Sequence, residues 1–524
     1  MWTYEEAMQY LNQSLVFGRK KGLYPMRQLL NYFGNPDHNL RFIHLAGTNG
    51  KGSTAMALAV MCAAAGLKTG LYTSPYVERF SERIRCLCKE NYMAAQVQRG
   101  DGEIDKESLA RLLAKVRAGV EAITPAISAY YGEKWQPSYF EILTVSAILY
   151  YAELHCDVVV WETGLGGEFD STNVIERAEI TILTALNYDH CEYLGNTLAE
   201  IAAAKAGIIK PGTTVFLYDI LTACPDPVAA GEALRVVMDK CQACKVPLYV
   251  IKPGDFAVCE RGLDGIEIDL RQAPTCLYKP AGCSSLPTGS PSIPTGCSSL
   301  PTGSPSMPTG CSSLPTGMMR KYFIPLIGQH QAMNMAVAIF AGATFLRQQT
   351  NFTDAQTVST IVAALPELYW PARLEVLQKK PPVLLDGAHN VQGATALGAA
   401  LHDLGIGHAA IWVCGFVRGK NHVEMVRHLI DTVGRAPLAI ICLTPPEPKR
   451  AVPAMELRQD LTKLNLFASA GGDTAFFVAA DPAEALSIWQ RDYATAPLVA
   501  FGSLYLAGPF KQAWRKFQET RNNE

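Results

Sequence analysis

A glycine-rich turn that carries a lysine and a serine lies near the start of the chain. It reads Gly47, Thr48, Asn49, Gly50, Lys51, Gly52 and Ser53. An apolar run at residues 41–46 precedes it, and an alanine-rich stretch follows at 54–65. The N–H groups of such a turn can approach a polyphosphate, and the N-terminus of a following helix adds partial positive charge. Lys51 could then reach the β- and γ-phosphate oxygens of ATP, and the Ser53 hydroxyl could bind Mg²⁺.

The match to a standard phosphate loop is incomplete. The usual pattern is G-x-x-x-x-G-K-S/T, whereas here residue 45 is Leu45 and Gly52 intervenes between Lys51 and Ser53. The alternative is a glycine turn between a strand and a helix that binds no ligand. The strand–turn–helix context and the lysine favour nucleotide binding.

Acidic and histidine side chains follow two further apolar runs. Glu162 comes directly after residues 157–161, and Asp189 and His190 follow residues 180–186. The carboxyl ends of parallel strands are where α/β sheets bind ligands. Glu162 is therefore a candidate magnesium ligand. The alternatives are a hydrogen-bonded polar group at a strand end for Glu162 and a structural hydrogen bond for His190.

A similar arrangement recurs in the second half of the chain. Asp386 and His389 follow the apolar run 382–385, on a predicted strand-to-helix turn. Asp386 could simply cap the next helix. The functional interpretation is that Arg373, Asp386 and His389 close onto a nucleotide held by the first half, and that Asp386 also orients an incoming amine.

The elements that must position these groups alternate between apolar strands and helices. The predicted strands are residues 41–46, 157–161, 180–186, 213–217, 382–385, 410–414, 439–443, 476–479 and 498–500. Helical stretches such as 54–65 and 198–206 lie between them. This alternation predicts largely parallel sheets covered by helices.

Length and composition limit the class of protein. The chain has 524 residues, 49% hydrophobic and 18% charged, with a formal net charge of −2. It predicts two or three domains with sizeable cores, and neither nucleic acid nor a membrane as partner. The N-terminus lacks a signal-peptide pattern, so a cytoplasmic protein is expected. The fifteen cysteines form no zinc pattern and are expected to be free thiols.

A 14-residue repeat rich in Ser, Pro, Thr and Gly begins at Cys283, Cys297 and Cys311. Such a segment buries too little apolar surface to offset its ordering entropy. Residues 281–317 are therefore predicted to be a disordered insertion. A second run of strands begins after residue 370, which places the predicted domain boundary near 368.

Several motifs resemble those of one enzyme family. The G-K-G-S ending of the turn resembles the folylpolyglutamate synthase and dihydrofolate synthase branch of the Mur ligases. Residues 162–173 are similar to its E-x-G-L-G-G-R-x-D-A/S-T-N motif, and 328–334 to its G-x-H-Q-x-x-N motif. The other similar segments are 72–75, 189–212, 370–375 (W-P-G-R-x-E), 386–390 (D-G-A-H-N) and 501–506, the last as a terminal strand.

The resemblance implies a fold and an activity. The fold is α/β: a P-loop-containing, mostly parallel N-terminal domain of the Mur ligase central type at residues 1–367, and a smaller Rossmann-like C-terminal domain at 368–524. The activity is ATP-dependent addition of L-glutamate to a folate, with dihydropteroate as a further candidate acceptor. The reaction would pass through an acyl phosphate and release ADP and phosphate, in a monomer.

The resemblance also implies residue roles. Magnesium ions would be held by Ser53, Ser74, Glu162 and His190. Lys205 would be carbamylated, which requires a neutral and therefore desolvated amine; the alternative is a solvated lysine on an alanine-rich helix. The ATP site would include residues 47–53, Gln331, Asn334, Arg373 and Asp386. Lys51, Lys205, Asp386 and His389 would act in catalysis. Asp170, Ser171 and Thr172 would face the substrate.

Four departures from the family pattern concern the folate and glutamate side. Glu168 replaces Arg, Tyr76 replaces His, residues 86–102 differ in spacing, and residues 418–421 replace most of a D-K-D segment. Two alternatives stay open. One is a peptidoglycan-precursor Mur ligase, and the other is a nucleotide-binding homologue without catalysis.

Overall fold

The largest sheet is built from the apolar runs of the first 280 residues. The protein is described here by a computed structural model, which covers residues 2–14, 22–224, 226–280, 317–447, 450–463 and 474–523. Its strand order is β10-β7-β6-β5-β1-β4-β2-β3. The strands are β1 (Phe42–Ala46), β2 (Thr69–Tyr72), β3 (Ile84–Leu87), β4 (Val158–Glu162), β5 (Ile180–Leu183), β6 (Thr214–Tyr218), β7 (Leu248–Ile251) and β10 (Thr275–Tyr278). All neighbours are parallel except β2–β3 and β7–β10.

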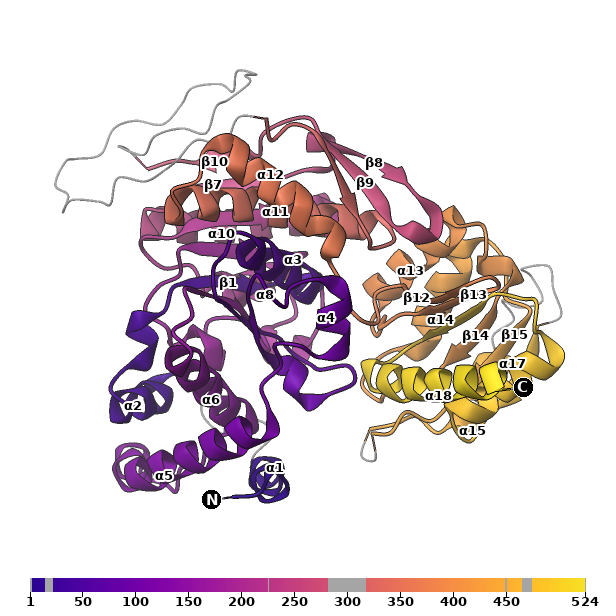
Figure 1. Cartoon of the computed structure of the whole chain (residues 1–524), viewed down its shortest axis with the longest axis horizontal. Helices are drawn as coiled ribbons and strands as arrows, with labels where there is room; N and C mark the ends of the chain where they lie inside the picture. Colours follow the sequence, from indigo (N-terminus) through magenta and orange to yellow (C-terminus); the bar gives the residue numbers. More distant parts are fainter. Residues whose placement is uncertain are drawn as a thin grey trace.

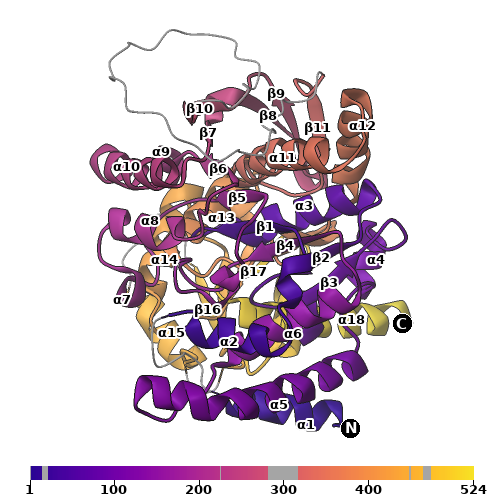
Figure 2. The ribbon, with the colours of Figure 1, turned by 90° about the vertical axis from the view of Figure 1, so that its left-hand side faces the viewer.

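Helices cover both faces of this sheet (Figure 2). One face packs against α3 (Lys51–Ala64), α11 (Gln329–Gln349) and α12 (Asp354–Ala364). The other packs against α1 (Tyr4–Gln13), α2 (Tyr24–Tyr32), α5 (Lys106–Tyr131), α6 (Tyr139–Glu153), α8 (Leu198–Ala206) and α10 (Pro227–Cys244). Along β1, Ile43 and Leu45 enter the first core and Phe42 the second, as the alternation of side chains in a strand requires. The sheet is buried on both sides, which explains its solid apolar strands.

A small antiparallel sheet extends this part of the molecule. It consists of β8 (Phe256–Glu260), β9 (Ile266–Leu270) and β11 (Lys321–Ile324). The predicted insertion at 281–317 falls between β10 and β11, and up to residue 316 it lies outside the described residues. Short helices at loops complete the arrangement: α4 (Ala94–Arg99), α7 (Cys191–Leu194), α9 (Ile220–Ala223) and the 3₁₀ helix η2 (Phe80–Arg83).

The last 150 residues form a second α/β body beside the first (Figure 1). Its sheet has the order β12-β13-β17-β14-β15-β16, parallel except for β12–β13. The strands are β12 (Glu375–Lys379), β13 (Pro382–Leu385), β14 (Ile411–Cys414), β15 (Ala439–Cys442), β16 (Ala475–Val478) and β17 (Leu498–Phe501). One face packs against α13 (Val391–Asp403), α14 (His422–Val433) and α15 (Ala454–Thr462), and the other against α17 (Pro482–Asp492) and α18 (Leu504–Asn523).

The predicted mostly parallel α/β fold is confirmed, but the expected terminal strand at 501–506 is wrong beyond its first residue. β17 ends at Phe501, Gly502 has φ +108°, and α18 begins at Leu504. The left-handed backbone at Gly502 turns the chain out of the sheet. The apolar Leu504 and Leu506 that suggested a strand instead pack from α18 into the core under the sheet.

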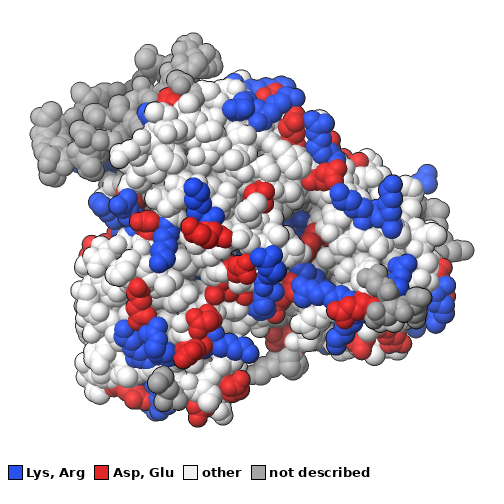
Figure 3. All heavy atoms as spheres, viewed as in Figure 1, with Lys and Arg blue, Asp and Glu red and all other residues white. Residues whose placement is uncertain are grey.

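Two surface properties bear on partners. Within the described ranges, no helix has the length and apolar character needed to cross a membrane. The face of the molecule seen in Figure 3 carries lysines and arginines interspersed with acidic residues, without a large patch of one sign.

Candidate active site

The phosphate loop, residues 47–53, joins the carboxyl end of β1 to α3, as predicted. Thr48 fastens it to the chain after β5: its N–H donates to Ala185 O at 2.7 Å, and its hydroxyl donates to Asn187 O at 2.8 Å. Gly50 has φ +89° and caps α3. Ser53 is buried in the first turn of that helix. These bonds fix the loop next to the chain that follows β5, and the loop leads directly into the first turn of α3.

Two lysine amines meet at one carbonyl of this loop. Lys51 Nζ lies 3.0 Å from Gly47 O, and Lys205 Nζ, from α8, lies 2.8 Å from the same oxygen. Lys205 is 4% exposed. Burial, with the charge of Lys51 added, lowers the pKa of Lys205 to about 7. The interpretation of Lys205 as a solvated surface lysine is thus wrong, because α8 turns it into the interior.

Glu162, the last residue of β4, lies opposite these amines. It is 3% exposed, and its Oε2 accepts the N–H of Ser74 at 3.1 Å. Burial raises the pKa of Glu162 to about 7, although the nearby charge of Lys51 and, more weakly, that of Arg373 act in the opposite direction. Two of the predicted magnesium ligands, Glu162 and Ser74, are therefore brought together. A cation beside this buried carboxylate would favour its charged form.

The His190 side chain is 48% exposed, and the residue, directly after Asp189, has φ +52°. Burial lowers its pKa, so the ring is mostly neutral near pH 7 and can act as a metal ligand. Among the described residues, no three His, Cys, Asp or Glu side chains lie close enough to form a metal site by themselves. The predicted set includes two hydroxyl ligands, and oxygen ligands of this kind suit Mg²⁺.

The side chains predicted around the nucleotide from later in the chain also reach the phosphate loop. Asn334 and Gln331, in the first turns of α11, are buried and joined by a 3.1 Å hydrogen bond. A side-chain carbon on Gly50 would overlap the Asn334 amide, and one on Gly52 would come within 2.7 Å of the Trp370 ring. Both glycines are therefore needed for the close approach of these residues.

Asp386 and Arg373 come from the second body. Asp386 accepts the N–H groups of Leu374 and Ala388, both at 2.8 Å. It thereby fixes the turn that carries Arg373, whose charge acts on both Asp386 and Glu162. The cap of α13 is Asn390, not Asp386, so the helix-cap interpretation of Asp386 is wrong. His389 donates from Nδ1 to Gly387 O at 2.8 Å, and burial lowers the pKa of its ring to about 4.

The sequence reasoning missed the contacts that Asn49 and Lys420 make across the two bodies. Asn49 bonds to Gln392 at 2.5 Å and to Asn390 at 3.2 Å. Lys420 lies 2.5 Å from Asp189. Burial alone would raise the pKa of Asp189, but Lys420 and His190 lower it to about 2. Lys420 lies in the loop after β14, and this position after a strand could have indicated a functional role. The departure from the family pattern at residues 418–421 obscured that indication.

The predicted substrate residues have structural partners. Asp170 accepts the N–H of Leu165 at 2.8 Å and the hydroxyl of Thr172 at 2.5 Å. The Thr172 hydroxyl also lies 3.0 Å from His44 Nε2. Ser171 is buried beside them. These bonds shape the loop after β4, and a substrate role for the three residues stays a prediction.

Known proteins resemble this chain in sequence and fold. The family model described as "Dihydrofolate synthetase, C-terminal domain" matches residues 372–512. The dihydrofolate synthase/folylpolyglutamate synthase of Bacillus subtilis is 32% identical over 437 residues, covering 83% of this chain and 84% of that protein.

Two solved structures match nearly the whole chain. One is the folylpolyglutamate synthase of Mycobacterium tuberculosis complexed with ADP and AMPPCP, with TM-score 0.73, 22% identity and 98% of both chains covered. Another is a folylpolyglutamate synthase complexed with AMPPCP and folate, with TM-score 0.68 and 26% identity, covering 98% of this chain and 99% of that one. The chain therefore belongs to the folylpolyglutamate synthase/dihydrofolate synthase family.

Proposed function

We propose that this protein is an ATP-dependent, ADP-forming ligase that adds L-glutamate to a folate. The observation that carries the proposal is the meeting of Lys51 and Lys205 at Gly47 O, with Glu162 nearby. The relatives named above act on folates, and one of them was solved with both an ATP analogue and folate. Membership of this family argues against a peptidoglycan-precursor ligase. The buried site with its charged side chains argues against a homologue without catalysis.

The two bodies of the molecule would have different roles in binding. The first, residues 1–367, would hold ATP on the phosphate loop and the folate beside it. The second, residues 368–524, would bring Arg373, Asp386 and His389 to the nucleotide. Bound Mg²⁺ would neutralise charge on the phosphates, with Ser53, Ser74, Glu162 and His190 as its ligands. Carbamylation of Lys205 would turn a repelled cation beside Lys51 into an oxygen ligand.

The chemistry would proceed in two steps. The terminal carboxylate of the folate attacks the γ-phosphorus of ATP, which gives an acyl phosphate and ADP. The amine of L-glutamate then attacks the acyl carbon, and phosphate leaves. Lys51 would stabilise the phosphoryl group in transfer, which is mainly an electrostatic and positioning task. Arg373 would add charge from the other side, and Asp386 would orient the amine. Contact between the two bodies would exclude water from the acyl phosphate.

Dihydropteroate is a second acceptor worth testing, because the Bacillus subtilis relative carries both activities in its name. Tyr76 and Glu168, which replace the usual family residues, are both exposed near the loops that carry Ser74 and Asp170. A monomer in the cytoplasm remains our expectation.

The test is ADP release with ATP, Mg²⁺ and L-glutamate and a panel of acceptors: dihydropteroate, dihydrofolate and tetrahydrofolate. Glutamate-dependent release with at least one acceptor is expected. Lys51→Ala should lower kcat by about 10²-fold or more, as loss of a transition-state charge partner does. Full activity of Lys51→Ala, or no release with any acceptor, would overturn the proposal.

A further inference from the structure

A buried lysine, Lys511, joins the two bodies of the molecule. Lys511 lies on α18, which packs on the chain between β2 and η2. We call residues 73–83 the Ser74 loop. A side-chain carbon on Gly508 would come within 2.5 Å of Val77 O, so the backbone of α18 touches this loop directly. One turn further along, the Lys511 side chain points inward and is 3% exposed.

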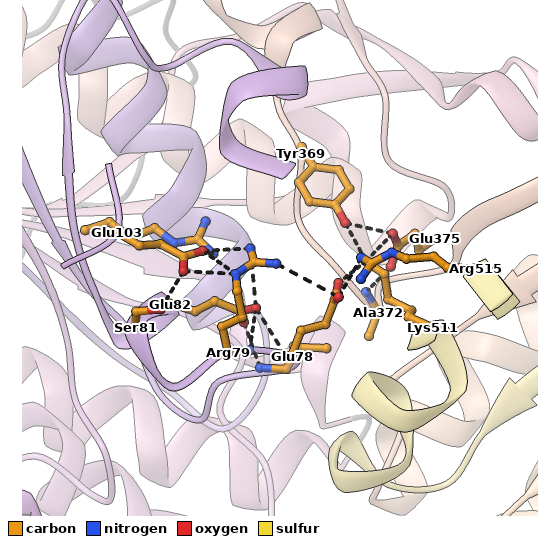
Figure 4. Close-up of polar contacts among 12 residues, drawn as sticks. Glu78, Arg79, Ser81, Glu82, Glu103, Tyr369, Ala372, Glu375, Lys511 and Arg515 are labelled. Atoms are coloured by element: carbon orange, nitrogen blue, oxygen red, sulfur yellow. Dashed lines mark hydrogen bonds and ion pairs between the residues drawn. The ribbon is translucent and has the colours of Figure 1, made fainter. Parts of the chain in front are cut away.

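Three oxygens surround the Lys511 amine (Figure 4). Its Nζ lies 2.6 Å from Glu78 Oε1, 2.7 Å from Glu375 Oε1 and 2.7 Å from the Tyr369 hydroxyl. Glu78 belongs to the Ser74 loop, and Glu375 begins β12 in the second body. Arg515, one turn after Lys511, adds a second contact to Glu78 at 2.6 Å. One amine therefore bridges carboxylates from both bodies.

On the first body, the loop that carries Glu78 is held firmly. The carboxylate of Glu82 accepts the N–H groups of Val77, Glu78 and Arg79 at 2.8 to 3.1 Å. Figure 4 shows Arg79 between Glu103, which it contacts at 2.7 Å, and the carboxylate of Glu78, which lies 4.0 Å from it. Near the start of this loop, the N–H of Ser74 donates to Glu162 Oε2 at 3.1 Å. The same loop therefore carries both Glu78 and the predicted metal ligand Ser74.

On the second body, Glu375 holds the turn that carries Arg373. Its Oε2 accepts the N–H of Ala372 at 3.0 Å, and its Oε1 accepts the Tyr369 hydroxyl at 2.7 Å. Arg373 lies between Ala372 and Leu374, and the N–H of Leu374 bonds to Asp386. The position of Arg373 is therefore defined by Glu375 on one side and Asp386 on the other.

We propose that Lys511 is a positioning residue that sets Arg373 in register with Glu162 and the phosphate loop. It acts by linking Glu78, four residues after Ser74, to Glu375, two residues after Arg373. Buried ion pairs contribute little net stability compared with apolar packing, but they enforce one geometry, because a displaced partner leaves a charge unpaired. Two carboxylates on one buried amine suit this task. The inference rests on the proposed function, since it concerns the same reaction.

The sharpest variant is Glu78→Gln, which weakens the link between the bodies but leaves Lys511 paired with Glu375. We expect a folded protein with unchanged ATP affinity and a kcat lowered by about 10- to 100-fold, the range in which a misplaced site loses activity. Glu519→Gln is the matched control, because Glu519 is an exposed glutamate on α18. It should keep wild-type kcat.

A double-mutant cycle separates positioning from general stability. If Lys511 works through Arg373, Glu78→Gln should lower kcat little further in an Arg373→Gln background. The inference would be overturned if Glu78→Gln lowered kcat by the same factor in the wild-type and Arg373→Gln proteins, or if Glu78→Gln alone kept the wild-type kcat. Absence of ligation by the wild-type protein would instead overturn the proposed function.

Gly508→Ala provides a second variant that leaves every charge in place. Alanine favours the helix more than glycine does, yet its side chain must displace Val77. The same loss of kcat at unchanged ATP affinity is expected. Wild-type kcat in this variant would contradict the proposed contact between α18 and the Ser74 loop.

Discussion

Lys51 and Lys205 donate to the same acceptor, the carbonyl oxygen of Gly47, at 3.0 and 2.8 Å. Burial is the main cost of charging Lys205, and repulsion by the nearby charge of Lys51 adds to it. The consequence is an amine beside the phosphate loop with a pKa of about 7, so that a large fraction of it is neutral at physiological pH. It gives the predicted carbamylation of Lys205 a physical basis that the sequence could not supply.

Carbamylation can be observed directly. With ¹³C-bicarbonate, the wild-type protein should show a carbamate carbon resonance that is lost in Lys205→Ala. The signal should weaken as pH falls through about 7, because the amine becomes protonated below its pKa. Lys240→Ala, on the surface helix α10, is the control and should keep the signal. A resonance that persists in Lys205→Ala would show that another amine reacts.

The close approach of Asn334 to the phosphate loop can be tested at Gly50. Gly50→Ala both strains a left-handed backbone and displaces the Asn334 amide. We expect ATP affinity to fall by about tenfold, which corresponds to a loss of about 1.4 kcal/mol of binding free energy. Gly66→Ala is matched, because Gly66 has φ +87° with open space around it. It should lose stability but keep ATP affinity, as measured by calorimetry. Equal affinities for both variants would contradict the account.

Asp386→Asn tests the turn that carries Arg373. An amide cannot accept both N–H groups as a carboxylate does, and Arg373 loses its counter-charge. The free energy of unfolding should fall by about 2 kcal/mol, the size of a hydrogen bond to a charged group, and ligation should fall with it. Urea unfolding and kcat measure the two effects. Asp403→Asn, at the exposed end of α13, should change neither; a fully active Asp386→Asn would remove this residue from the mechanism.

The contribution of Glu78 to stability should depend on pH. Burial alone would raise its pKa, but Lys511 and Arg515 outweigh burial and leave the pKa below 4.5 in the folded state. A carboxyl with a lowered folded pKa stabilises the protein above its unfolded pKa, and this contribution is lost as pH falls through the folded pKa. The difference in unfolding free energy between wild type and Glu78→Gln should therefore be about 2 kcal/mol at pH 7 and shrink below pH 4.5.

Urea titrations at neutral and acidic pH measure that difference. Glu519→Gln, at an exposed position on α18, should show no such change. A difference that grows at low pH would mean that Glu78 is not held charged by Lys511.

The sequence predicted local features better than long-range contacts. Strand ends carrying Glu162 and Asp386 could be placed because apolar runs mark parallel strands. The burial of Lys205 could not be predicted from its alanine-rich helix alone. Such a sequence does not show whether the helix exposes one face or is buried all round. Lys511 gave no signal, because its partners Glu78 and Glu375 lie more than 100 residues away. The strand expected at 501–506 failed because an apolar pattern of six residues fits either a strand or a helix start.

The most direct test of the central claim follows oxygen from the acceptor into phosphate. A folate substrate labelled with ¹⁸O in its terminal carboxylate is incubated with ATP and L-glutamate, and the released phosphate is analysed by mass spectrometry. Attack of that carboxylate on the γ-phosphorus predicts one ¹⁸O in each phosphate. Unlabelled phosphate, formed while glutamate is added to the folate, would contradict an acyl phosphate at this site.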